Sequence, residues 1–458
     1  MHIIEALNKV INKKPVLFTT PGHCQEADFL NGLDFLRSAY KYDFSEIEGL
    51  DNLQYPEEAI LESQKWASKI YGSGHSYYLV NGSSSGILAL MLATVKTGEK
   101  VLIARNAHKS VINALILTGA EPVWINTEWD NNWNIPTCVT LENIQNIFAA
   151  NLDIKVVWLT SPTYEGVVTD ISPIVQFCRE KGLLLIVDEA HGALWNFSDK
   201  LPATAISQGV DASVQSLHKT ASCLNQGAIL HLGKNSKIDP VKVQQSLNII
   251  NTTSPSYLIL ASIEGTIEYL DSISGKNKLD ILLENIDNFR KKLTSTEKIN
   301  FLKNTERFEI DKTKLFFGIK DVPGQVLGDF LLEKFNIEVE LDNDKGVLAL
   351  TGIGTSPNKL EKLSESVIQS VDLLENCTNK TNSFPLIKPE MIYTPKEAFN
   401  KNGKKVKLNN LVGKICKETI VMYPPGIPIL ISGELIRQQH IDLINYRDEI
   451  EIIVESDF

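Results

Sequence analysis

The sequence has few cysteines, and several features that it lacks exclude whole classes of protein. Its six cysteines are scattered over 458 residues without a C-x-x-C pair, so neither a metal site nor a redox motif is predicted. Scattered cysteines are typical of a reducing cytosol. The start, MHIIEALNKVINKK, lacks the basic head and apolar core of a secretory signal. The longest apolar runs, such as ILALMLATV from Ile87, are too short to span a membrane. A cytoplasmic protein without a membrane partner is predicted.

Positive charge and nucleotide-binding strings are also scarce. The chain carries 45 Lys and Arg against 56 Asp and Glu, a net charge of -11, which argues against nucleic acid as a partner. The strings G-x-x-x-x-G-K-[ST] and G-x-G-x-x-G are both absent. The stretch VDEAH (187–191) therefore does not indicate a helicase, because that chemistry needs the phosphate loop, and a dinucleotide enzyme is not suggested.

What the sequence does contain is an alternation of apolar strand-like runs and helix-like segments from about residue 75 to 232. Helices are expected at 84–98, 110–119, 141–150 and 171–182. The strand candidates are SYYLV (76–80), KVLIA, EPVWI, KVVWLT, LLLIV, SVQSL and GAILHL (227–232). This alternation predicts an α/β fold with a mainly parallel sheet covered on both faces.

The rest of the chain predicts further units. The segment 271–375 has a different sequence pattern and predicts a smaller α+β domain. It contains KLDILLENIDNFRKKL, KLFFGI, VLGDFLLEKF, IEVEL and VLALTGI. The polar stretch ENCTNKTNS (375–383) is expected to be a linker. The length favours two or three domains. We expect an arm at 1–30, a large domain at 31–270, a small domain at 271–375 and a C-terminal domain at 384–458.

Chemically useful residues follow five of the expected strands directly. Because ligands bind outside the carboxyl ends of the strands in such sheets, these residues are expected to share one crevice. They are NGSSS (81–85), then Arg105, Asn106 and His108, then SPTYE (161–165), DEAH (188–191), and His218 with Lys219.

Each of these residues has a structural alternative when taken alone. Lys219, in SVQSLHKTAS, is a candidate nucleophile if apolar surroundings remove its proton, and a surface loop lysine otherwise. NGSSSG opens a helix where an anion is favoured, or is an N-cap with spare serines. Asp188 ends the most apolar strand and needs a cation or donor, or is an ordinary strand-end cap. The alternative interpretation of His108 is a loop histidine with a structural role only.

One cofactor uses all of these parts together. Pyridoxal 5'-phosphate (PLP) needs a lysine for a Schiff base, an acid for its ring nitrogen, a flat group to stack on its ring and an anion cradle. Lys219, Asp188, His108 and Ser83 to Ser85 supply these parts. The combination indicates a PLP enzyme.

The ordered motifs resemble those of the bacterial-type ornithine/lysine/arginine decarboxylases over nearly the whole chain. TPGH (20–23) and EIEGLDNLQYP (46–56) are similar to N-terminal motifs of that family. LVNGSSSG, RNAHKS, SPTYEG, VDEAHG and SLHKT are similar to its cofactor site, TTSPSY (252–257) to the segment that follows, and MYPPGIPIL with SGE (422–434) to its C-terminal domain. The resemblance implies an aspartate aminotransferase-like large domain (PLP fold type I), together with the small α+β domain and a C-terminal decarboxylase domain.

The resemblance also implies roles for individual residues. Lys219 carries PLP as a Schiff base, Asp188 pairs with its ring nitrogen, and His108 stacks on the ring. The remaining cofactor contacts are Ser83, Ser84, Ser85, His191, Ser216 and His218, of which His218 also assists proton transfer. Residues that reach a neighbouring subunit's phosphate are matched by Thr252, Thr253 and Ser254, which implies a homodimer or higher homo-oligomer with shared active sites.

The implied reaction is decarboxylation of a basic amino acid to an amine and CO2, as in polyamine biosynthesis, with arginine or lysine favoured over ornithine. The distal cation needs an acidic contact, for which Glu46, Asp51 and Glu434 are candidates, unless they are helix caps or surface carboxylates. Cys24 and Ser432 depart from the family pattern, and both bear on the substrate. The alternatives are another PLP fold type I reaction, an aminotransferase or a lyase, and a catalytically silent regulatory homologue.

Overall fold

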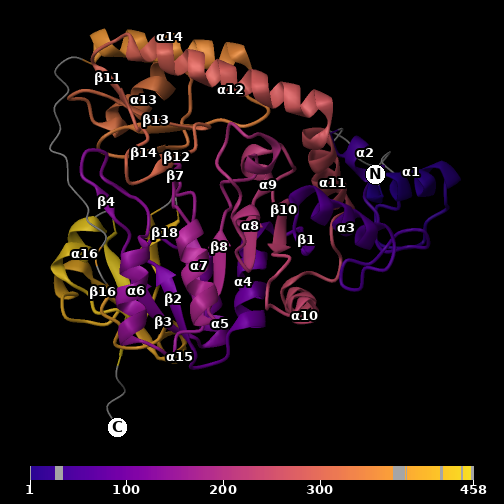
Figure 1. Ribbon diagram of the computed structural model, residues 1–458, viewed down its shortest axis with the longest axis horizontal. Helices are drawn as coiled ribbons and strands as arrows, with labels where there is room; N and C mark the ends of the chain where they lie inside the picture. The colour runs from indigo at the N-terminus through magenta and orange to yellow at the C-terminus, as the bar shows by residue number, and fades with distance from the viewer. Residues whose placement is uncertain are drawn as a thin grey trace.

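The computed structural model describes residues 2–25, 35–374, 387, 389–422, 426–444 and 447–454. The linker expected at 375–383 lies outside the described residues. In Figure 1, the central sheet and its helices fill the middle of the molecule, with the α+β part above them and the C-terminal part at the lower left.

The core of the protein is a seven-stranded sheet in the order β1-β10-β9-β8-β6-β2-β3. Neighbours from β9 to β3 run parallel, and β10 is antiparallel to both β9 and β1. The prediction of a mainly parallel sheet is confirmed, with β10 as the exception. The strands are β1 (His75–Leu79), β2 (Lys100–Ala104), β3 (Glu121–Ile125), β6 (Val156–Thr160), β8 (Leu184–Asp188), β9 (Ala212–Gln215) and β10 (Ala228–Leu232).

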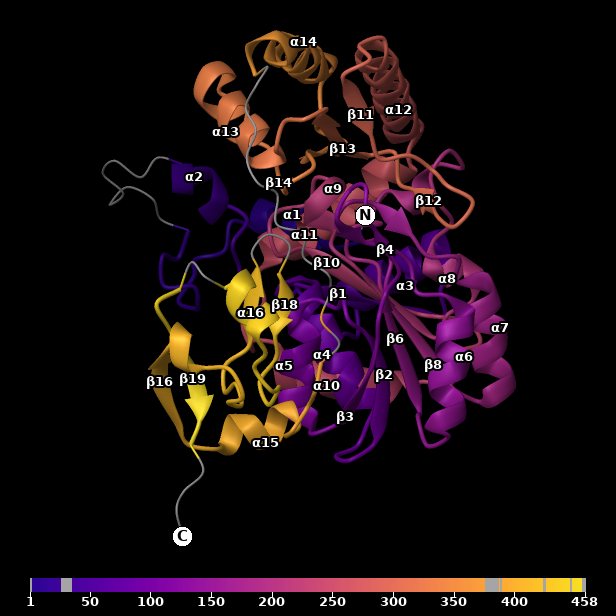
Figure 2. The ribbon, with the colours of Figure 1, turned by 90° about the vertical axis from the view of Figure 1, so that its left-hand side faces the viewer.

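Helices cover both faces of this sheet, as Figure 2 shows. One face carries α4 (Gly82–Thr94), α5 (Lys109–Thr118) and α10 (Pro240–Ile250), and the other carries α6 (Leu141–Ala150), α7 (Ser172–Lys181) and the short α8 (Ala205–Gln208). Helices α5 and α7 end at Gly119 (φ 74°) and Gly182 (φ 70°), a left-handed conformation that glycine adopts without penalty. These two helices and α6 confirm the predictions.

The helix expected at 84–98 is shorter than predicted. It ends at Thr94, because Val95 is extended and the chain then turns, with the Glu99 N–H donating to the Lys96 carbonyl. Gly98 does not cap the helix; its N–H donates to the Gly119 carbonyl.

The smaller part is built on a four-stranded sheet in the order β11-β13-β15-β14. KLFFGI is a strand, and VLGDFLLEKF lies within a helix. Of IEVEL, only the last residue, Leu341, lies in a strand. The elements are β11 (Ile299–Phe301), β13 (Lys314–Ile319), β14 (Leu341–Asp342), β15 (Val347–Leu350), α12 (Ile273–Thr294), α13 (Gly324–Phe335) and α14 (Pro357–Leu373).

The C-terminal part has its own apolar core, which includes Leu411, Leu430 and Ile450. Arg105, 1% exposed at the end of β2, joins it to the central sheet: its side chain donates to the carbonyls of Ile387, Pro428 and Ile429. The elements are α15 (Pro395–Asn400), β16 (Gly403–Lys407), β17 (Ile420–Met422), β18 (Ile427–Leu430), α16 (Gln438–Leu443) and β19 (Glu449–Ile453), with α15 against α5.

The N-terminal helices pack against the large domain around the buried carboxylate of Glu264. It accepts N–H groups of His2, Ile3 and Ile4 and the Ser63 hydroxyl, so it caps the first turn of α1. The elements here are α1 (Ile3–Lys13), α2 (Phe35–Tyr40), α3 (Ala59–Tyr71) and α11 (Tyr257–Asp271), and the remaining short ones are β4 (Trp129–Asp130), β5 (Ile135–Pro136), β7 (Val167–Val168), β12 (Glu309–Ile310) and α9 (Leu217–Thr220).

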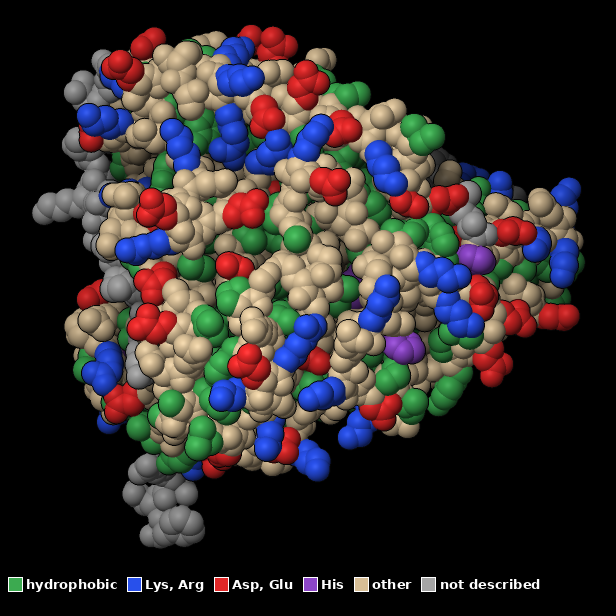
Figure 3. Space-filling model, viewed as in Figure 1, with side chains coloured by type: hydrophobic (Ala, Val, Ile, Leu, Met, Phe, Trp, Pro, Cys, Tyr) green, Lys and Arg blue, Asp and Glu red, His purple; other side chains and the backbone are tan. Residues whose placement is uncertain are grey.

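Charges of both signs are interspersed over the face shown in Figure 3, so the negative net charge does not gather there in one patch. Within the described ranges, no helix is both long and apolar enough to cross a membrane.

Candidate active site

A cavity of about 60 Å³ lies at the carboxyl ends of the central strands, where the sequence predicted a crevice. Five predicted site residues, including Lys219 and Asp188, line it together. The full lining is Ser83, Asn106, His108, Thr160, Pro162, Thr163, Tyr164, Asp188, Ala190, His191, Lys219 and, from the C-terminal part, Ile427.

Lys219 enters this cavity from α9, the single helical turn that follows β9. Its Nζ lies 2.8 Å from His191 Nε2. Burial lowers the pKa of Lys219 below its usual range; Asp188 opposes this shift, and the charge of Lys314 adds to it. The amine is therefore biased towards its neutral, nucleophilic form.

His191 links Lys219 to the mouth of the cavity. It is 7% exposed, and its pKa is lowered well below 6.5, first by burial and then by the charge of Lys219. Its ring meets the ring of Tyr164 edge-on, with centroids 4.5 Å apart, and the Tyr164 hydroxyl donates to Glu340. A neutral imidazole in contact with a lysine amine can accept or return a proton.

Asp188 supplies the buried acid. It ends β8, is 3% exposed, and accepts the Ala190 N–H at Oδ1. Burial raises the pKa of Asp188, while Lys219 and the Ala190 N–H partly offset that shift. A buried carboxylate that lines a cavity is poised for a cationic partner inside it.

His108 presents a flat, uncharged ring to the same cavity. Its Nδ1 accepts the Ser110 N–H, so the neutral ring carries its proton on Nε2. The pKa of His108 is lowered to about 4, first by burial and then by Lys219.

The serines at the start of α4 lie beside the cavity, but they are not equivalent. Ser83 accepts a hydrogen bond from the Ser216 hydroxyl, 2.9 Å away, which joins the ends of β1 and β9. Ser85 turns its hydroxyl back to the Gly82 carbonyl and is buried there. His218 points its Nδ1 at the Gly227 carbonyl, 3.0 Å away. The Gly82 N–H donates to the Gln226 carbonyl. Ser83 and Ser216, together with the other backbone N–H groups of the first helical turn, form the better-placed anion cradle.

A buried ion pair behind the cavity was missed by sequence reasoning. Lys314 Nζ lies 2.8 Å from Asp311 Oδ2 and also donates to the His191 carbonyl. Gly166 leaves room for it, because a Cβ at this glycine would lie 2.8 Å from the Lys314 side chain. KLFFGI predicts a strand, but its pattern does not indicate that the first lysine is buried.

Several predicted residues do not line this cavity within one chain. Thr252, Thr253 and Ser254 are exposed in the loop before α11. Asp51 caps α3, where its carboxylate accepts several backbone N–H groups. Glu434 is 0% exposed and accepts the Ile431 N–H.

Glu46 lies in the N-terminal part, where its Oε2 accepts a hydrogen bond from the neighbouring Ser45 hydroxyl. Its other oxygen, Oε1, is buried without a hydrogen-bond partner among the described residues. Glu46 thus lies apart from the cavity around Lys219, like the other two acidic candidates.

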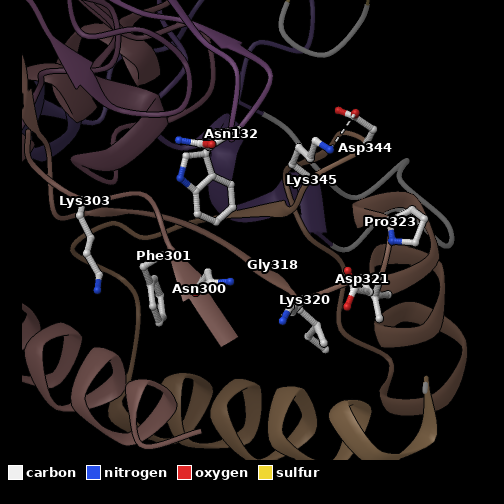
Figure 4. A pocket seen from close by; sticks show the side chains of 13 residues that line it. Asn132, Asn300, Phe301, Lys303, Gly318, Lys320, Asp321, Pro323, Asp344 and Lys345 are labelled. Carbon is white, nitrogen blue, oxygen red and sulfur yellow. Dashed lines mark ion pairs between the residues drawn. The ribbon is translucent and has the colours of Figure 1, made fainter. Parts of the chain in front are cut away.

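A larger cavity lies elsewhere, between the small sheet and the loop that joins β4 to β5, and Figure 4 shows it. Its volume is about 550 Å³. Its lining includes Lys303, Lys320 and the ion pair Lys345–Asp344, all of them from the small domain. It contains none of the residues predicted from the sequence, so chemistry rather than volume identifies the candidate active site.

Comparison with known protein families gives two matches that together span most of the chain. The family described as Orn/Lys/Arg decarboxylase, major domain, matches residues 2–330, and the one described as Orn/Lys/Arg decarboxylase, C-terminal domain, matches residues 376–455. The chain is also 32% identical to an arginine decarboxylase of Bacillus subtilis, over 96% of this chain and 91% of that protein.

Solved structures confirm the predicted fold class. A lysine decarboxylase of Francisella novicida superposes with a TM-score of 0.84 at 20% identity, covering 99% of this chain and 81% of that one. A PLP-dependent aminotransferase of Streptococcus suis superposes with a TM-score of 0.52 at 16% identity, covering 70% of this chain and 82% of that one. The large domain therefore has the fold of the PLP-dependent aminotransferases.

Proposed function

The chain belongs to the Orn/Lys/Arg decarboxylase family and is an amino-acid decarboxylase that acts on a basic amino acid; from this premise we propose that it converts arginine to the corresponding amine and CO2 with PLP as its cofactor. Arginine is proposed because a relative that matches 96% of this chain is an arginine decarboxylase. The observation that carries the proposal is the one cavity in which Lys219, Asp188 and His108 meet.

The residues of the cavity fit this cofactor. Asp188 Oδ2 has no hydrogen-bond partner in the part of the chain that the structure describes. Burial raises the pKa of this carboxyl by more than the charge of Lys219 lowers it, so a further counter-charge would stabilise the carboxylate. A protonated ring nitrogen would supply that counter-charge. Lys219 would hold the cofactor covalently and His108 would stack on its ring. The phosphate would be held by Ser83, Ser84, Ser216 and His218, whereas the Ser85 hydroxyl is committed to the Gly82 carbonyl.

PLP, when bound, supplies a ring that takes up the electron pair released as the substrate's carboxylate leaves as CO2. Asp188 would hold the proton on the ring nitrogen, which would keep the ring electron-poor. Lys219, whose pKa is lowered by burial, would hold the cofactor through its amine and would bring a proton to the α-carbon after CO2 has left. His191, 2.8 Å from Lys219 Nζ, would accept and return the lysine's proton.

The same cavity leaves other reactions of this cofactor as alternatives. An aminotransferase or a lyase breaks a different bond at the same carbon, and the orientation of the bound substrate decides which bond breaks. A silent regulatory homologue would lack the lysine, but Lys219 is present and in contact with His191.

The remaining expectations belong to the same proposal. We expect a cytoplasmic enzyme of polyamine biosynthesis, a homodimer or higher homo-oligomer with active sites shared between subunits, and the domain limits given by the sequence. The exposure of Thr252, Thr253 and Ser254 leaves them free to meet a second copy of the chain.

The absorbance spectrum of the purified protein tests the proposal first. We expect a visible-edge band that is lost in Lys219→Ala and kept in Lys320→Ala, a lysine outside the cavity. Arginine, lysine and ornithine are then added separately, and CO2 and amine are measured. Arginine is expected to release both. A band without CO2, but with a keto acid or an elimination product, would favour the alternatives, and a colourless protein that ignores added PLP would refute the cofactor.

A further inference from the structure

A second cavity, of about 190 Å³, adjoins the one around Lys219. Ile427 lines both cavities. The turn that follows β6 also separates them: Thr163 and Tyr164 line the first cavity, and the next residue, Glu165, lines the second. The second cavity therefore lies next to the first, on the side of the C-terminal part.

Glu165 is the unusual residue of this second cavity. It is 4% exposed, and its Oε2 has no hydrogen-bond partner among the residues that the structure describes. Burial raises the pKa of Glu165 above its usual range, and hydrogen bonds from its own backbone and the Thr163 side chain offset this shift only in part. A buried carboxylate with one oxygen unpartnered is stabilised when a cation or a further donor reaches it.

The rest of the wall is mainly apolar and carries further negative charge. Apolar side chains of Ile429, Leu341 and Met422 line it, and Asp342 and Asp344 add carboxylates. Arg105 also lines the cavity, but its guanidinium donates to three carbonyls, and among the described residues it forms no ion pair with Glu165. This combination suits an aliphatic chain that ends in a cation.

We propose that the second cavity receives the side chain of the substrate and that Glu165 pairs with its distal cation. The methylene groups would lie along the apolar wall, while the α-carbon stays beside Lys219. This inference rests on the proposed function, since a basic amino acid is a short aliphatic chain with a cation at its end.

The other acidic candidates are less well placed for this role. Asp51 is committed to backbone N–H groups. Glu434 accepts the Ile431 N–H and lies 3.2 Å from His440 Nε2, and neither residue lines the second cavity. Glu340 is exposed at the mouth of the first cavity and accepts the Tyr164 hydroxyl, so water competes there for any cation. Among these residues, Glu165 is the one that both lines the second cavity and has a buried oxygen without a hydrogen-bond partner in the described part of the chain.

The test is a calorimetric titration of the PLP-loaded protein with amines that cannot be decarboxylated. Three carry a distal cation: 4-guanidinobutylamine, 1,5-diaminopentane and 1,4-diaminobutane. Pentylamine has a methyl group instead. We expect the wild type to bind at least one cationic amine more tightly than pentylamine. In Glu165→Gln, which keeps the size and removes the charge, this preference should fall by about tenfold or more, with pentylamine unchanged.

Matched variants separate the possible outcomes. Glu338→Gln, at an exposed position, should behave as the wild type. Equal preference in the wild type and in Glu165→Gln would overturn the inference, as would a loss of preference in Glu340→Gln alone. Ile429→Phe tests the apolar wall independently and should weaken the binding of all four amines alike. Unchanged binding in this variant would also contradict the proposal that the substrate side chain enters this cavity. A wild type that releases no CO2 but shows the Glu165-dependent preference would refute the proposed function and retain the inference.

Discussion

Burial keeps the histidines around Lys219 uncharged near neutral pH, and this has a consequence for acid stability. An unfolded histidine takes up its proton near pH 6.5, whereas His108 in the folded protein does so only near pH 4. Between these values the unfolded chain binds more protons, so the stability of the fold falls as the pH falls.

Replacement of His108 by phenylalanine should remove this part of the acid sensitivity. Phenylalanine keeps a flat ring of similar size but has no proton to bind. Between pH 7 and pH 4.5 we expect the cofactor-free variant to lose roughly 2 to 3 kcal/mol less stability than the wild type, because each tenfold difference in proton affinity is worth about 1.4 kcal/mol. Urea titrations at both pH values measure the free energy of unfolding, with His75→Phe on the surface as the control. Equal losses would mean that His108 is protonated in the folded state well above pH 4.

The buried pair Lys314–Asp311 gives a second prediction at this scale. Lys314→Met leaves the Asp311 carboxylate buried without its cation, which typically destabilises a protein by about 3 to 5 kcal/mol. The double variant Lys314→Met, Asp311→Leu removes both charges and should recover most of that loss. Denaturation midpoints of the two variants compare them directly. A double variant as unstable as the single one would assign the role of Lys314 to its contact with the His191 carbonyl instead.

At the scale of elements, the sequence predicts well where local pattern and local chemistry agree. Helix α5 begins after His108, whose side chain accepts the Ser110 N–H, and α7 carries Pro173 in its first turn. Both helices end at glycines with positive φ. The run ILALMLATVKTG also ends in a glycine, Gly98, but this glycine lies beyond the helix and donates to Gly119. The end of α4 at Thr94 depends on a turn that the pattern does not reveal. The antiparallel direction of β10 is likewise invisible, because a buried strand has the same composition in either direction.

The residues of the candidate site likewise fall into those that local sequence pattern predicts and those that it does not. Lys219, Asp188, His108 and Ser83 follow strands, so the rule for ligand sites in parallel sheets finds them. Glu165 follows a strand too, but its unpartnered oxygen depends on the C-terminal part packed across it. Lys314 and Glu340 come from the small domain, more than 90 residues further along the chain, and no local signal connects them to His191 or Tyr164.

Arg105 makes the packing of the C-terminal part testable. It donates to the carbonyls of Ile387, Pro428 and Ile429 beside Ile427, which lines both cavities. Arg105→Ala leaves three acceptors without a donor, so β18 should exchange its amide hydrogens faster and KM for the substrate should rise about tenfold. Arg179→Ala, which loses one exposed hydrogen bond to Gly209, is the control. Unchanged exchange in β18 would show that the apolar core of the C-terminal part suffices to hold it.

At the scale of the whole molecule, the cavity around Lys219 lies where three parts of the chain converge. The central sheet supplies its floor, Glu340 of the small part reaches Tyr164 at its mouth, and Ile427 of the C-terminal part closes one side. The loop with Thr252, Thr253 and Ser254 is exposed and does not line it. If these three residues serve a cofactor phosphate, they serve that of another copy of the chain.

Mixed oligomers test whether active sites are shared. Lys219→Ala and the triple variant Thr252→Ala, Thr253→Ala, Ser254→Ala should each have little activity alone. When the two chains are co-expressed, random pairing makes half of the dimers mixed, and a shared arrangement gives each mixed dimer one site without either defect. Activity should therefore recover to about a quarter of the wild type. If every site is built from one chain, each site keeps a defect and the mixture stays as inactive as its parents, which would assign the three residues to the surface of a single subunit.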